Sequence, residues 1–181
     1  MPDENRLAPE ISAGFPPIVA PGARLLILGS LPSRKSLAMR EYYAHAQNAF
    51  WRIMGELFDA GPALPYAERT RRLVQAGIAV WDVLASSVRP GSLDSAIRPE
   101  TAAGNEFSAF FKRYPGIATV CFNGKKAQQL FARLIDGRAA ALAGREYRLL
   151  PSTSPAHAAM SYAEKLQAWS VVRSAAGGSH Q

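Results

Sequence analysis

Short apolar runs alternate along the chain with segments in which apolar residues recur at helical spacing. The runs predict buried strands over residues 24–28, 78–84, 117–122 and 146–150. Helical spacing predicts a helix that begins near Asn48 or Ala49, with Asn48 as its N-cap. Further helices are predicted over residues 66–76, 107–114, 124–135 and 162–173.

Strands that alternate with helices predict a mostly parallel sheet covered on both faces. We therefore expect an α/β fold, a three-layer αβα sandwich with a central, mostly parallel four-stranded sheet. The 181 residues fit one domain over 1–181. Its irregular parts are expected to be an extended N-terminal segment at 1–22, a long loop at 30–47 with room for a helical turn, a long loop at 86–105, and a frayed tail at 174–181.

The carboxyl ends of the predicted strands are where such folds place their sites. The loops that follow the four strands are also the most polar segments and the richest in Gly, Ser and Pro. They cover residues 29–33, 82–92, 122–126 and 151–158. Function is therefore expected in these loops.

Composition narrows the class of protein. With 48% apolar and 19% charged residues, the chain can bury a core. No run reaches the roughly 18 to 20 apolar residues of a membrane span, and the polar N-terminus is unlike a secretory signal, so we expect a cytoplasmic protein without a membrane partner. The single cysteine, Cys121, predicts a buried thiol and no multi-cysteine metal site, and we expect neither metal nor cofactor. A net charge of +7 favours a polyanionic partner.

Two loops carry candidate chemistry, each with an ordinary alternative. The segment YYAHAQNAFW at 42–51 combines aromatic rings with amides, which suits a flat heterocycle, although core aromatics and a capping Asn explain the same pattern. The segment STSPAHA at 152–158 offers hydroxyls and an imidazole for phosphates, or is a plain loop. The turn GSLPS at 29–33 lacks the pattern of a P-loop, a dinucleotide fold or a nucleophile elbow.

Taken together, five segments resemble the uracil-DNA glycosylase superfamily, and specifically its hypoxanthine-DNA glycosylase branch, often called family six. The Tyr-Ala-His of 43–45, followed after two residues by Asn-x-Phe-Trp, is the most specific part of the resemblance. The matching segments are LLILGSLPS (25–33), EYYAHAQNAFWRI (41–53), GIAVWDVLASSVRPGSLDSAI (77–97), VCFNGKKA (120–127) and LPSTSPAHA (150–158).

The resemblance implies roles for single residues. Superfamily members usually carry an Asp or Asn in the first motif to position water, where this chain has Ser30. In the hypoxanthine branch the Asn of the second motif, here Asn48, takes over as the catalytic residue. Tyr43 is implied to stack on the flipped base, and Asp82 to read its edge. The loop 152–158 is implied to clamp phosphates and push the base out. The remaining implied contacts are Gly29, Ser30 and Phe50 with the base, and Ser33, His45, Ser152, Ser154 and His157 with DNA.

The expected protein is thus a monomeric, monofunctional DNA glycosylase that acts on double-stranded DNA containing a deaminated base. Hypoxanthine is the first choice of base and uracil the second. An alternative enzyme would be a serine hydrolase that uses Ser30, Ser33 or Ser154 with His157 and an Asp such as Asp82. A third alternative is a basic nucleic-acid-binding module without catalysis.

Overall fold

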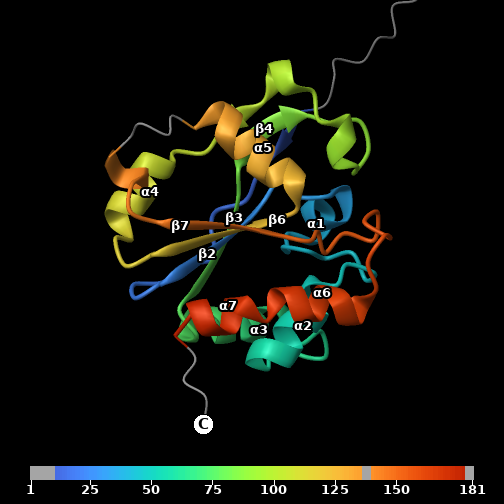
Figure 1. The fold of residues 1–181 in the computed structure, drawn as a ribbon. Helices are drawn as coiled ribbons and strands as arrows, with labels where there is room; N and C mark the ends of the chain where they lie inside the picture. Colours follow the sequence, from blue (N-terminus) through green and yellow to red (C-terminus); the bar gives the residue numbers. More distant parts are fainter. Residues whose placement is uncertain (1–10, 136–139, 178–181) are drawn as a thin grey trace, which may run out of the picture.

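A four-stranded parallel sheet forms the centre of the molecule (Figure 1). The computed structural model describes residues 11–135 and 140–177. The strands are β2 (Leu25–Gly29), β3 (Ile78–Asp82), β6 (Thr119–Asn123) and β7 (Glu146–Leu150). Their order is β3-β2-β6-β7, and every neighbouring pair is parallel. The four predicted strands and their parallel arrangement are confirmed.

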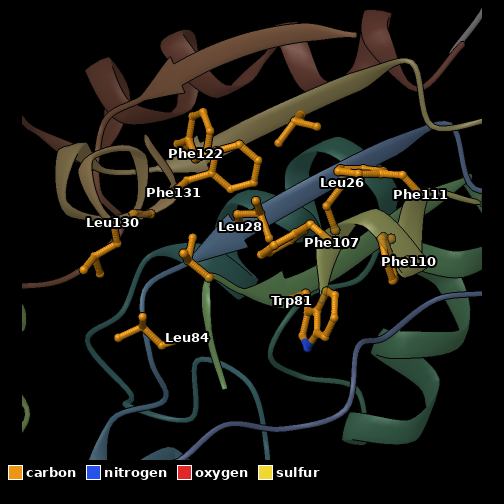
Figure 2. Packing of buried hydrophobic residues seen from close by; sticks show 14 of the residues in the cluster. Leu26, Leu28, Trp81, Leu84, Phe107, Phe110, Phe111, Phe122, Leu130 and Phe131 are labelled. Carbon is orange, nitrogen blue, oxygen red and sulfur yellow. The ribbon is translucent and has the colours of Figure 1, made fainter. Parts of the chain in front are cut away.

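Helices cover both faces of this sheet. Successive strand residues point to opposite faces, and because the strand residues are apolar on both faces, each face needs a covering layer. The helices are α2 (Phe50–Phe58), α3 (Tyr66–Gln75), α4 (Phe107–Arg113), α5 (Lys125–Leu134), α6 (Tyr162–Trp169) and α7 (Val171–Ala175). Leu25 and Ile27 pack in one apolar cluster with α2, α3, α6 and α7, which lie below the sheet in Figure 1. Leu26 and Leu28 pack in the other cluster, where α4 and α5 supply several aromatic rings (Figure 2). The three layers are therefore those predicted.

A second, antiparallel sheet of three strands was not predicted. It consists of β1 (Ile11–Ala13), β4 (Leu84–Val88) and β5 (Ala103–Gly104), in the order β1-β4-β5. The prediction of one long loop at 86–105 is wrong, since that segment holds most of β4, β5 and two 3-10 helices, Asp94–Ala96 and Pro99–Thr101. The sequence of β4, LASSV, has small and polar residues in its middle, and its partners lie far along the chain, so no local pattern marked it.

Smaller differences concern the loops and the C-terminus. The predicted loop 30–47 contains helix α1 (Arg34–Met39), and a third 3-10 helix covers Ala140–Leu142. The predicted last helix is divided at Ser170 into α6 and α7. Ala176 is buried behind α7, so the frayed tail does not begin at 174. Residues 1–10 of the N-terminal segment and 178–181 of the tail lie outside the described residues. No helix among the described residues is long and apolar enough to cross a membrane.

Candidate functional site

A cavity of about 520 Å³ opens at the carboxyl edge of the parallel sheet. Gly29 ends β2, Asp82 ends β3 and Asn123 ends β6, and all three line the cavity. The loop after β7 contributes residues 152–157, and the start of the first 3-10 helix together with the two residues before it contributes 92–95. All predicted site residues except Phe50 line it, namely Gly29, Ser30, Ser33, Tyr43, His45, Asn48, Asp82, Ser152, Ser154 and His157.

The floor of the cavity requires a glycine at residue 29. A Cβ atom there would lie 2.5 Å from Asp82 Oδ1 and 2.9 Å from the Tyr43 hydroxyl oxygen. Both distances are shorter than carbon–oxygen contacts in packed interiors allow. Gly29 therefore lets a carboxyl group and a phenol approach the end of β2 together.

The backbone around Asp82 is fixed from both sides. Immediately after it, the chain leaves the parallel sheet and enters β4 of the second sheet. At this junction the N–H groups of Val83 and Leu84 donate to the carbonyls of Gly29 and Ser30, at 2.8 and 3.1 Å. The Asp82 carbonyl accepts from Asn105 Nδ2 at 2.9 Å. The side chain of Asp82 thus projects into the cavity from a backbone that is hydrogen-bonded on each flank.

The Asp82 carboxyl changes its charge near neutral pH. Its Oδ2 atom is buried and has no hydrogen-bond partner among the described residues. Burial and, after it, the negative charge of Asp94 raise the pKa of Asp82 to about 7, while the positive charge of Arg89 opposes the shift. A buried carboxylate without a partner is costly unless a ligand supplies a donor. Such a group in a cavity is typical of a functional site.

Tyr43 presents an aromatic ring to the cavity and is held there by Phe50. Its backbone has a φ of 54°, a left-handed conformation that side chains other than glycine adopt rarely. The ring stacks on Phe50 with centroids 4.0 Å apart and planes inclined by 24°. Phe50 is fully buried at the start of α2 and does not line the cavity, so its predicted contact with the base is corrected to a supporting role behind Tyr43.

Asn48 lies half-buried beside the cavity, just before α2. The predicted N-cap is displaced by one residue, because the helix begins at Phe50 and Ala49 occupies the cap position. The Asn48 side chain nevertheless accepts a hydrogen bond from the Phe50 N–H through Oδ1 at 3.0 Å. That bond fixes the amide and leaves one lone pair of Oδ1 and the whole NH₂ group for a ligand. His45 is exposed at the rim, and its Nδ1 accepts from the N–H of Gln47.

Ser30 and Asp94 form a hydrogen-bonded pair that sequence reasoning did not find. Ser30 Oγ donates to Asp94 Oδ1 at 2.6 Å. Arg89 Nη1 lies 3.8 Å from the same oxygen, and the guanidinium also donates to the carbonyls of Leu31 and Pro32. The Arg89 side chain is only 1% exposed, so this cation is built into the wall. The loop after β2 is therefore tied to the segment after β4 through the buried guanidinium of Arg89 and the partly exposed carboxyl of Asp94.

Asn123 connects the third strand to the loop after the fourth. Its Nδ2 donates to Thr153 Oγ1, and its Oδ1 accepts from the Thr153 N–H, both at 2.9 Å. The Thr153 carbonyl in turn accepts from the N–H of Ala49, next to Asn48. Asn123 and Thr153 were missed as site residues, although the polar Asn-Gly directly after an apolar strand was the available signal.

The hydroxyls and the imidazole of 152–158 lie at the rim of the cavity. Ser152, Ser154 and His157 are each half-buried there. Ser152 Oγ accepts from the N–H of Ser154, whose carbonyl accepts from the His157 N–H at 3.0 Å and from Lys165 Nζ at 3.4 Å. The loop is therefore ordered by its own turns and by a lysine of α6.

The hydrolase alternative needs a serine hydroxyl that is hydrogen-bonded to a histidine. Within residues 11–135 and 140–177, no serine hydroxyl is bonded to the imidazole of His157. Ser33 Oγ donates to Ser36, and Ser154 Oγ accepts from the N–H of Ala156. In the same described residues, no group of three or more His, Cys, Asp or Glu is placed to hold a metal ion. The arrangement suits recognition of a flat polar ring better than acyl transfer.

Comparison with known proteins yields consistent matches. Residues 16–173 match the family model described as the uracil DNA glycosylase superfamily. A hypoxanthine DNA glycosylase of Methanosarcina acetivorans is 35% identical over 148 residues, which are 81% of this chain and 89% of that protein. A hypoxanthine DNA glycosylase of Methanosarcina barkeri is 36% identical over 115 residues, 63% of this chain and 72% of that protein.

A solved structure also resembles the fold. The solution NMR structure of a protein from Methanosarcina acetivorans has a TM-score of 0.76 and 33% identity, and the match covers 92% of this chain and 99% of that one. The family match spans all four strands of the parallel sheet and every loop that lines the cavity.

Proposed function

The chain belongs to the uracil-DNA glycosylase superfamily and is a DNA glycosylase, and from its cavity we propose that it hydrolyses the N-glycosidic bond of hypoxanthine in double-stranded DNA. The choice of hypoxanthine rests on the Asp82 carboxyl at the cavity floor, whose Oδ2 atom is buried and has no hydrogen-bond partner among the described residues. The two relatives named hypoxanthine DNA glycosylase support the same choice.

The base must leave the duplex to reach this carboxyl. The glycosidic bond of a base that is stacked inside a duplex cannot be reached from an enclosed cavity. Enzymes that act on such a base therefore rotate the nucleotide outward, which costs the energy of unstacking it. The cavity, at about 520 Å³, is in the size range of pockets that enclose small heterocycles. The Tyr43 ring, backed by Phe50, provides the flat surface on which a purine can stack.

Asp82 selects the base by accepting a hydrogen bond from it. Ionised Asp82 accepts the N1–H of hypoxanthine, whereas adenine has no hydrogen on N1 and leaves the buried oxygen unpaired. An unpaired buried acceptor costs about 1–3 kcal/mol, and more when it is charged. Uracil offers an N–H at N3, which makes it the second candidate.

Asn48 positions the attacking water. Bond cleavage passes through an oxocarbenium-like state at C1′ of the sugar. An amide is too weak a base to remove a proton at neutral pH, but the free lone pair of Asn48 Oδ1 can orient water, and orientation contributes several kcal/mol. Among the described residues that line the cavity there is no lysine, so we expect no Schiff-base intermediate and no lyase activity.

The rim holds the DNA backbone. The hydroxyls of Ser33, Ser152 and Ser154 and the imidazoles of His45 and His157 surround the opening and are suitable phosphate ligands. A net charge of +7 adds a long-range attraction for DNA, which weakens as salt rises. These contacts position the strand and leave the choice of base to the floor of the cavity.

Base release from four matched duplexes tests the proposal. The duplexes carry inosine, uracil, xanthine or a G·T mismatch, and free base is measured by chromatography. We expect hypoxanthine to be released fastest, with strand breakage only after alkali treatment. Faster release of uracil would correct the choice of base. Release of no base from any duplex would refute the proposal, and salt-dependent binding would then favour the non-catalytic module.

The rate of hypoxanthine release should rise with pH through about 7. The ionised carboxyl of Asp82 is the accepting form, and its fraction grows as pH passes its pKa of about 7. Asp94→Asn removes the negative charge that helps to raise this pKa, so the midpoint of the rise should move to lower pH. Single-turnover rates measured from about pH 5 to about pH 9 give both the rise and its midpoint.

The matched control is Glu100→Gln, which removes the same charge from an exposed residue that does not line the cavity. It should leave the midpoint where it is in the parent protein. A profile that is flat with pH, or that is unchanged in Asp94→Asn, would contradict the role given to Asp82.

A further inference from the structure

Two buried oxygens at the cavity floor have no hydrogen-bond partner among the described residues, the Tyr43 hydroxyl and Asp82 Oδ2. The proposed function gives Oδ2 a partner, the N1–H of the base, and gives the Tyr43 ring a task in stacking. The Tyr43 hydroxyl has no task in it. A buried hydroxyl without a partner costs free energy, so phenylalanine would be the more stable residue for stacking alone. The phenol oxygen therefore calls for a role of its own.

The Tyr43 hydroxyl lies next to the other oxygen of the same carboxyl group. A Cβ atom at residue 29 would lie 2.9 Å from the Tyr43 hydroxyl oxygen and 2.5 Å from Asp82 Oδ1. Both oxygens thus converge on the space that Gly29 leaves open, while Oδ2 is the carboxyl oxygen that remains for a base. A carboxylate accepts hydrogen bonds through both of its oxygens, so the two contacts do not compete.

The phenol remains a donor while Asp82 ionises. Burial and, after it, the negative charge of Asp82 raise the pKa of Tyr43 above its usual range. Tyr43 therefore keeps its hydrogen at the pH at which Asp82 loses its proton, about 7. A donor that faces a carboxylate stabilises the charged form and lowers its pKa.

Other ionisable groups also surround the pair. Asp94 faces both side chains, and Arg89 faces Asp82. The phenols of Tyr42 and Tyr66 lie near Asp82 as well, and burial raises the pKa of each, so both stay protonated. Asp94 cannot donate as an anion, and the Arg89 guanidinium donates to backbone carbonyls. The phenol that shares the space above Gly29 is therefore the donor placed for Oδ1.

We propose that Tyr43 is a positioning residue whose hydroxyl donates a hydrogen bond to Asp82 Oδ1 when a base fills the cavity, and so directs Oδ2 at the N1–H. The inference rests on the proposed function, because Oδ2 needs a fixed direction only if it reads the base. Tyr43 then acts on the ligand twice, through the ring that stacks on it and through the carboxyl that selects it.

Tyr43→Phe tests the role, because it removes the hydroxyl and keeps the ring that stacks on Phe50. Single-turnover release from a duplex carrying inosine is measured from about pH 5 to about pH 9. Loss of the donor should move the midpoint of the rise up by about one pH unit and lower the rate at neutral pH by about tenfold. Part of the rate should return at high pH. The rim imidazoles are the same in every variant, so a displaced midpoint reports on Asp82.

The control is Tyr42→Phe, the same change at the adjacent residue. The Tyr42 hydroxyl donates to the carbonyls of Phe15 and Pro16, at 3.3 and 3.0 Å. Its loss should lower the melting temperature and leave the midpoint in place. Tyr43→Phe gives up no hydrogen bond in the free protein and should melt at the parent's temperature or above it.

A Tyr43→Phe midpoint equal to that of the parent, or a rate lowered by the same factor at every pH, would overturn the positioning role. The proposed function would stand in that case, since the parent still releases hypoxanthine. A parent that releases no hypoxanthine would overturn the proposed function and the role of the hydroxyl with it.

Discussion

Asn48→Ala should reduce the single-turnover rate of hypoxanthine release by about a hundredfold or more and leave DNA binding in place. The proposed function gives this amide the task of orienting water at C1′ and assigns it no phosphate contact. The substitution also removes the hydrogen bond to the Phe50 N–H, which costs about 1 kcal/mol of stability at a helix start. Rates with enzyme in excess, together with a binding isotherm, separate the two quantities.

Asn48→Ser distinguishes chemistry from capping. Serine supplies an oxygen for the Phe50 N–H, so stability should return, but its shorter side chain does not reach as far into the cavity and activity should stay low. Gln47→Ala changes the exposed neighbour, which does not line the cavity, and should behave as the parent. Full activity of Asn48→Ala would remove Asn48 from the mechanism.

Gly29→Ala, which adds one methyl group at the cavity floor, should lower both stability and activity strongly. The added Cβ would lie 2.5 Å from Asp82 Oδ1 and 2.9 Å from the Tyr43 hydroxyl, and both partners are enclosed. Overpacking of this kind costs about 1–3 kcal/mol. Asp82 and Tyr43 are the groups proposed to read and stack the base, and displacing them by even about 1 Å should lower the rate on the order of a hundredfold. Thermal unfolding and single-turnover release measure the two effects.

Gly61→Ala is the matched control for an added methyl group. A Cβ at Gly61 would meet its nearest neighbour, the Cα of Gly55, at 3.5 Å, which is an ordinary contact. We expect nearly parental stability and activity. If Gly29→Ala were as active as Gly61→Ala, neither Asp82 nor Tyr43 would need its observed position.

The sequence was informative wherever one segment carried its own signal. The four parallel strands are continuous apolar runs because both of their faces are buried, and that pattern is visible without knowing the partner strand. Strand β4 is different, because the residues in its middle are small and polar. Its pairing with β1 and β5 joins segments that are distant in the sequence, so no local pattern indicates it. Loops that follow buried strands were therefore located, and a second sheet was not.

Site residues divide in the same way. Those at the carboxyl ends of β2 and β3, such as Gly29 and Asp82, could be placed by topology and by the family motifs. Asp94 and Arg89 could not, because their roles arise from contacts with Ser30 and Leu31 over separations of 64 and 58 residues. The sequence showed an aromatic residue at Phe50. Whether its side chain points into the cavity or into the core depends on the residue at which α2 begins, and the sequence did not fix that residue.

The junction between β3 and β4 has a consequence for how this enzyme can diversify. Residue 82 stands on backbone that is hydrogen-bonded to Gly29, Ser30 and Asn105, and none of those bonds uses its side chain. A different side chain at that position can therefore present another pattern of donors and acceptors without disturbing the scaffold. If residue 82 reads the base as proposed, a single substitution there changes the preference for one damaged base over another, while the strands and the aromatic surface of Tyr43 stay unchanged.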